Sequence, residues 1–154
     1  PWRTTAGVRP RRGAGQVHMG MNSRLDAVQA AVLLGHLDGL DARLAQRRVV
    51  AQRLDAVAGA MGVARDPGSP VTVYALRHPD RDQVVAALDT AGIDTCIYYP
   101  HTLADHPAVA GRVRTAGALA HGKDFCREVF SVPCYAGLTD VAVQRICHAL
   151  EPWA

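Results

Sequence analysis

The sequence predicts a small α/β domain that follows a long helical connector. Three observations support this fold class. Apolar residues between Leu25 and Met61 recur at spacings of three, four and seven, which is the period of an amphipathic helix. Short runs rich in branched and aromatic side chains then alternate with helical patterns as far as Leu150. A chain of 154 residues with 49% hydrophobic residues is long enough to close one core without metal or disulfide links.

The connector is expected to consist of two helices in tandem. Ser23 and Asp26 approximate a capping box, so the first helix should begin near Ser23. Gly35 and Gly39 lie inside the helical pattern, where each costs about 1 kcal/mol relative to alanine, and we therefore predict a break near His36. The chain divides into an irregular basic segment, the helical connector and the α/β domain, at residues 1–22, 23–62 and 63–154.

The α/β domain is predicted as strand, helix, strand, loop, helix, strand and helix. Asp80 should begin the first of these helices and Gly92 should end it, while Pro100 closes the second strand. Pro133 lacks an amide hydrogen, so the third strand should lie at an edge or bend there. The expected ranges in chain order are 71–76, 81–91, 93–99, 101–115, 116–129, 129–135 and 139–150.

The charge pattern argues against a nucleic-acid site, although the formal net charge is +3. Four arginines lie within the first twelve residues, before any acid, and could neutralise phosphates, namely Arg3, Arg9, Arg11 and Arg12. No aromatic residues lie between them to stack on bases, so we expect an exposed loop instead. The chain has no apolar run of about 18 residues and no apolar signal segment, and we expect a cytoplasmic protein without a membrane span.

The cysteines do not predict a metal site. Cys96, Cys126, Cys134 and Cys147 form no C-x-x-C pair and have no H-x-x-x-H beside them. We expect four small buried side chains in a reducing compartment. A nucleophilic Cys96 working with His101 is the alternative.

The run GMNSRLDAVQAAVL at 20–33 combines Gly, Asn, Arg, an aliphatic residue, an acid and Gln-Ala-Ala. In this pattern it resembles the DegT/DnrJ/EryC1/StrS family of pyridoxal-phosphate (PLP)-dependent sugar aminotransferases. RHPDRDQVVAALDTAGIDTCIYYP then resembles the family's strand, helix and strand before Tyr-Pro. FSVPCYAGLTDVAVQRICHAL resembles its closing segment, and the three matches come in the family's order.

The resemblance implies the small carboxyl-terminal domain of a fold-type I PLP-dependent transferase. The cofactor domain, with its Schiff-base lysine, would then precede Pro1. Lys123, the only lysine here, does not match that position, so no residue of this chain is assigned a catalytic role. The full-length homodimer should bind PLP and convert a nucleotide-linked keto sugar to an amino sugar with an amino acid donor, whereas this chain alone should be inactive. The alternative is a noncatalytic dimerisation or binding module derived from that fold.

Four residues are candidates for binding. By resemblance, Asn22 reaches across the dimer to the phosphate of the partner's PLP; from spacing alone it is a turn residue before Ser23. Arg24 could grip a phosphate of the nucleotide-linked sugar or form a salt bridge with Asp26. Tyr99 and His101 lie where the family's loop approaches the sugar, and the alternatives for both are packing or solvent exposure.

The resemblance has departures, and these fall on the substrate side. The family commonly has His at the position of Tyr98 and an aromatic residue at that of Met21. It has Pro-Leu-His-Leu-Gln where this chain has residues 102–106, so that Ala104 replaces the family's loop histidine. We expect these changes to affect the sugar, or activity itself, and not the fold.

Overall fold

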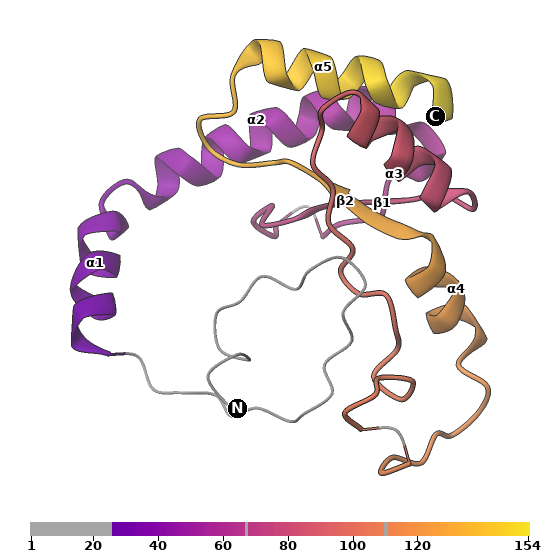
Figure 1. Cartoon of the computed structure of the whole chain (residues 1–154). Helices are drawn as coiled ribbons and strands as arrows, with labels where there is room; N and C mark the ends of the chain where they lie inside the picture. The colour runs from indigo at the N-terminus through magenta and orange to yellow at the C-terminus, as the bar shows by residue number, and fades with distance from the viewer. Residues whose placement is uncertain (1–25, 67, 110) are drawn as a thin grey trace.

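The computed structural model describes residues 26–66, 68–109 and 111–154 (Figure 1). After two leading helices, the chain continues as a strand, two helices, a second strand and a last helix. In chain order they are α1 (Ala27–Leu37), α2 (Leu40–Ala58), the 3-10 turn η1 (Gly59–Met61), β1 (Tyr74–Arg77), α3 (Arg81–Thr90), α4 (Ala120–Glu128), β2 (Val129–Val132), α5 (Asp140–Leu150) and the 3-10 turn η2 (Glu151–Trp153).

The connector is two helices, as predicted, and the break falls at Asp38 and Gly39. Its beginning corrects the prediction. Asp26 has extended backbone angles, and its carboxylate accepts the amide hydrogens of Val28 and Gln29 at 2.7 and 3.3 Å. Asp26 is therefore the N-cap and α1 begins at Ala27, because an acid can accept both of these otherwise unpaired N–H groups by itself. Ser23 lies outside the described residues.

The sheet is an antiparallel pair of strands. β1 and β2 run in register from Tyr74 opposite Val132 to Arg77 opposite Val129. β2 stops one residue before Pro133 and lies at an edge of the two-stranded sheet, as predicted. Only Ser131 has neighbours on both sides. Cys96 supplies the second neighbour through hydrogen bonds of 3.0 and 2.7 Å with Ser131.

The predicted strand at 93–99 is wrong as a strand, because only Cys96 pairs, as an isolated bridge. Ile93 and Thr95 are buried and face inward, but from Tyr98 to Pro100 the chain is exposed. Branched and aromatic residues favour strands because they pack on a half-buried sheet surface, and here that surface ends near Cys96.

The core lies between the sheet and the helices α2, α3 and α5, which gather on one side of it (Figure 1). Alternate strand residues point into this core, so that Tyr74 and Leu76 on β1 are fully buried. The residues that pack against them are Leu54 and Ala58 of α2, Val84 and Leu88 of α3, Phe130 and Val132 of β2, and Val143, Ile146 and Leu150 of α5.

The first half of the connector lies outside this core. α1 contains no buried residue, and Val28 and Leu34 are 74% and 65% exposed. The first buried residue of the connector is Val50, in the middle of α2. Figure 1 shows α1 next to the start of α2 and away from α3, α4, α5 and the sheet, so these elements do not cover its apolar residues.

The cysteines are less buried than expected, since only Cys134 is fully buried. All four are free; Cys134 is buried, Cys126 and Cys147 are half-buried, and Cys96 is exposed. Cys96 points outward because its neighbours Ile93 and Thr95 take the inward positions. No group of three or more metal-ligating side chains occurs among residues 26–66, 68–109 and 111–154. No helix in the described part of the chain is both long and apolar enough to cross a membrane.

Candidate functional site

The candidate site is the loop that joins Cys96 to α4. The described residues of this loop form neither helix nor strand, only turns and bends. Between Ile97 and Glu128 no described residue is buried, so the loop has no apolar core of its own. Its path is set by local turns and polar contacts, for example the backbone hydrogen bonds from Asp105 to Thr102 and from Val109 to His106.

The two described candidates, Tyr99 and His101, are both on the surface of this loop. Tyr99 is 69% exposed, and its ring meets that of Tyr98 edge-on at a centroid distance of 5.7 Å. His101 is also exposed. Of the alternatives considered for these two side chains, exposure is what the structure shows, and packing is excluded. Both are therefore accessible to a ligand.

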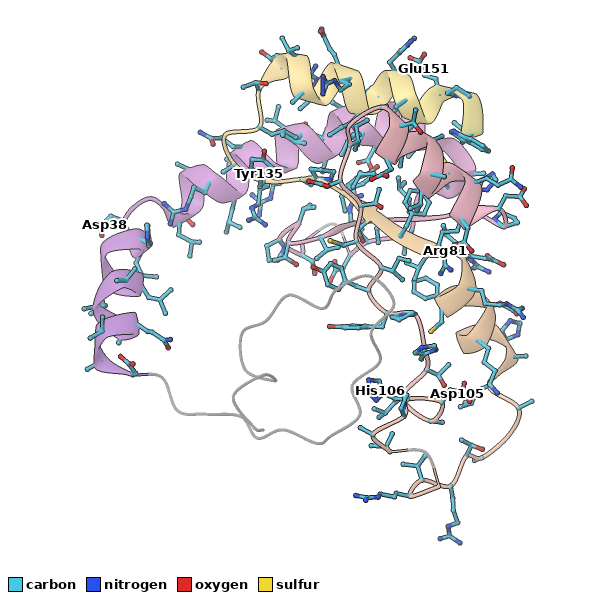
Figure 2. The ribbon with its side chains drawn as sticks, in the orientation of Figure 1. Asp38, Arg81, Asp105, His106, Tyr135 and Glu151 are labelled. Atoms are coloured by element: carbon cyan, nitrogen blue, oxygen red, sulfur yellow. The ribbon has the colours of Figure 1, made fainter. Side chains whose placement is uncertain are left out.

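A polar cluster ties the start of the loop to α4. The Thr102 hydroxyl donates to Asp105 Oδ2 at 2.8 Å, and Asp105 Oδ1 lies 3.4 Å from Lys123 Nζ in the first turn of α4. The methyl group of Thr102 also approaches α4, since a Cβ added at Gly122 would lie 3.6 Å from it. Figure 2 shows Asp105 and His106 on the loop as it extends away from α2 and α5.

The electrostatics of this cluster favour a charged Asp105. The hydrogen bond from Thr102 contributes most to lowering the pKa of Asp105, and the positive charges of Lys123 and of protonated His101 lower it further. Partial burial raises the pKa of Cys126, and the charge of Asp105 raises it again. Cys126 therefore stays a thiol at neutral pH, which makes it a poor nucleophile.

The alternative of a nucleophilic Cys96 assisted by His101 receives no support from the geometry. Within the described part of the chain, neither the Cys96 thiol nor the His101 ring makes a hydrogen bond. A nucleophile and its base normally lie within hydrogen-bond reach of each other.

Two of the four binding candidates lie outside the described residues, and the only lysine forms an ion pair. Asn22 and Arg24 fall outside the described residues. Lys123 is half-exposed and paired with Asp105. Sequence reasoning missed Thr102 and Asp105 as partners, although their T-x-x-D spacing is similar to that of a capping box, in which the hydroxyl oxygen accepts the backbone N–H three residues on, as Thr102 does from Asp105 at 3.3 Å.

Comparison with known proteins identifies the class. The model of the DegT/DnrJ/EryC1/StrS aminotransferase family matches residues 4–151, and the chain belongs to this family. The predicted fold class is confirmed as well. Solved structures similar to this chain are aminotransferases, and the chain spans only a part of each.

Two relatives and one solved structure show how far the similarity extends. The chain is 35% identical over 143 residues to dTDP-3-amino-3,4,6-trideoxy-alpha-D-glucose transaminase of Streptomyces venezuelae, covering 88% of this chain and 37% of the relative. It is 34% identical over 143 residues to UDP-2-acetamido-2-deoxy-3-oxo-D-glucuronate aminotransferase of Pseudomonas aeruginosa, covering 87% and 38%. The crystal structure of S. venezuelae DesV in complex with a ketimine intermediate superposes with a TM-score of 0.75 at 33% identity, covering 94% and 40%. The chain thus spans less than half the length of each.

Proposed function

We propose that this chain is the carboxyl-terminal part of a PLP-dependent enzyme that transfers an amino group from an amino acid to a nucleotide-linked keto sugar. The observation that carries the proposal is the family match over residues 4–151. Two of the relatives bear the names of aminotransferases that act on dTDP- and UDP-linked sugars. The proposed division is a basic segment from the cofactor domain at 1–22, a connector at 23–62 and a small domain at 63–154.

The described residues do not fit a PLP site of their own. PLP requires a lysine amine, and the one lysine of the chain, Lys123, is engaged with Asp105. PLP supplies an electron sink for amino transfer when it is bound, and in this proposal the lysine that holds it lies on a part of the protein outside this chain. We therefore assign to this chain only binding roles.

The binding roles fall on two segments. Asn22 would donate its amide to the phosphate of the partner's PLP across a homodimer interface, and Arg24 would hold a phosphate of the nucleotide. Tyr99 and His101 would form hydrogen bonds to hydroxyl groups of the sugar, and their exposure on the loop supports this assignment.

The test is a chimera in which this chain replaces the corresponding carboxyl-terminal part of the S. venezuelae relative. The chimera should bind PLP, react with an amino acid donor, and aminate a nucleotide-linked keto sugar. Tyr99→Phe and His101→Ala should each raise KM for the sugar, while the reaction with the donor alone stays unchanged. Val141→Ala, on the 75% exposed residue of α5, is the control and should change neither.

Two results would contradict the proposal in different ways. A folded chimera that binds PLP and reacts with donors but aminates no nucleotide-linked sugar would show that the substrate class is wrong. A folded chimera in which PLP and donor do not react would favour the noncatalytic dimerisation or binding module.

A further inference from the structure

We infer that Lys123 is a positioning residue for the sugar-binding loop. Through Asp105, its ammonium group holds residues 101–106 against α4 and so sets where Tyr99 and His101 lie. This inference rests on the proposed function, because it concerns the loop that we assign to the sugar. It adds a role for the only lysine of the chain, one that does not involve a covalent bond to PLP.

The Asp105 carboxylate is the link between loop and helix. Each of its oxygens has a different partner, since Oδ2 accepts from Thr102 on the loop and Oδ1 faces Lys123 on α4. The backbone amide of Asp105 donates to the carbonyl of Thr102 at 3.1 Å and approaches its hydroxyl at 3.3 Å, which closes the turn. The carboxylate thus joins a closed turn to a helix.

The helix side of the link is fixed by regular structure. The backbone amide of Lys123 donates to the carbonyl of Leu119 at 2.9 Å, which makes Lys123 part of the first turn of α4. α4 leads directly into β2, whose residues are all buried. The ammonium group is therefore attached to the rigid part of the molecule, and the carboxylate to the part without a core.

The ion pair is weak, but its loss should still release the loop, because no buried side chain of the loop holds it in place. Lys123 and Asp105 are 50% and 44% exposed, and pairs of this kind contribute modestly to stability in general. No described residue from Ile97 to Glu128 is buried, so the loop loses no core contact when it moves. We expect loss of the pair to increase the population of open loop conformations by roughly threefold to fivefold.

The first experiment measures amide hydrogen exchange on this chain. Lys123→Met keeps the length of the side chain and removes its charge, and it should speed exchange at residues 102–106 by about threefold to fivefold while α2 and α5 exchange as before. Lys123→Arg should restore the slow exchange. Arg114→Met is the control, because Arg114 lies on the same loop and has no ion pair within the described residues.

The second experiment uses the chimera described above. Lys123→Met should raise KM for the nucleotide-linked keto sugar by a similar factor, with kcat and the reaction with the donor unchanged, and Lys123→Arg should restore KM.

Unchanged exchange at 102–106 in Lys123→Met would overturn the inference, whatever the activity. Faster exchange with an unchanged KM in an active chimera would also overturn it. An inactive parent chimera combined with faster exchange would instead contradict the proposed function, because the pair would still be shown to hold the loop.

Discussion

At the scale of single residues, the strongest polar cluster of the described chain links three separate segments. Asp55 on α2 accepts two hydrogen bonds from Arg65, at 2.9 and 2.6 Å, and one from the Tyr74 hydroxyl on β1, at 2.8 Å. The Arg65 guanidinium also lies over the Tyr74 ring, 4.9 Å from its centroid. The cluster satisfies the hydroxyl group of a tyrosine that is otherwise fully buried.

This cluster makes stability depend on pH. Burial alone would raise the pKa of Asp55, but the hydrogen bonds from Arg65 and Tyr74 and the charge of Arg65 lower it overall. Burial raises the pKa of Tyr74, and its bond to Asp55 raises it further, so the phenol stays protonated. Because the folded pKa of Asp55 is below the unfolded value of about 3.9, its contribution is present above that pH and is lost as the pH falls through the folded pKa.

Tyr74→Phe tests the cluster. Removing the hydroxyl should lower the free energy of unfolding by about 1 kcal/mol at pH 7, and less at a pH acidic enough to protonate Asp55 in the folded state, because a protonated carboxyl is a weaker acceptor. Urea unfolding at the two pH values measures both costs. Tyr135→Phe is the control, since Tyr135 is 49% exposed, and it should cost little at either pH. An equal cost of Tyr74→Phe at both pH values would show that the Asp55 charge plays no part.

At the scale of the elements, the ends of α5 follow directly from the sequence. Thr139 has extended backbone angles, and its hydroxyl accepts the amide hydrogen of Ala142 at 3.2 Å. Asp140 follows in the first turn, where its charge is favourable near the helix N-terminus, and it pairs with Arg53 of α2 at 2.5 Å. One short polar segment therefore begins α5 and attaches it to α2.

Replacing this cap should destabilise the protein by a predictable amount. Thr139→Ala should lower the free energy of unfolding by about 1 kcal/mol, because an N–H group at the start of α5 loses its acceptor. Thr139→Ser retains the hydroxyl oxygen and should cost only a few tenths of this. Thermal or urea unfolding of both variants measures the difference, and similar losses in the two would mean that the methyl group of Thr139 matters and not its hydroxyl.

Elements were predictable wherever one local signal sufficed. The start of α3 after Asp80, the start of α5 at Thr139, the stop at Gly92 with its φ of 71°, and the break close to His36 all depend on residues that act within one turn. The segment 93–99 was not predictable as a single bridge, because its pairing depends on how much sheet surface Ser131 and its neighbours offer. A strand forms only where another strand offers hydrogen bonds, and for this segment the partner residue, Ser131, lies far along the chain.

At the scale of the whole molecule, the exposed apolar side of α1 is the largest departure from an ordinary monomer surface. Its members are 52% to 74% exposed, namely Val28, Val32, Leu33, Leu34 and Leu37. Contiguous apolar surface of this kind usually contacts another protein surface. The chain spans 37% of the length of its S. venezuelae relative, which leaves most of such an enzyme available to cover this side.

The isolated chain should therefore self-associate. Sedimentation velocity over a range of concentrations should show species larger than a monomer, and Leu33→Gln with Leu37→Gln should shift them toward the monomer. Val141→Gln on the exposed side of α5 should leave the distribution as it is. A wild-type chain that stays monomeric throughout would mean that this apolar side does not drive association.

The isolated chain should also fail to hold PLP covalently. Incubation with PLP, reduction with borohydride and mass spectrometry should give no stoichiometric adduct on Lys123, because its ammonium is half-exposed and paired with Asp105. A complete single adduct at Lys123 would contradict the assignment of purely binding roles to this chain.

The sequence alone determined the family, the helices and the region of the candidate loop, because these depend on spacing, local caps and motifs that lie within short stretches of chain. Tertiary structure decided which apolar residues enter the core, how far the segment around Cys96 pairs, and that Asp105 joins Thr102 to Lys123. The physical reason is that burial and long-range pairing depend on what lies opposite a side chain. The same hydrophobic period occurs in α1 and in the second half of α2, yet only the latter has a sheet and α5 against which to pack.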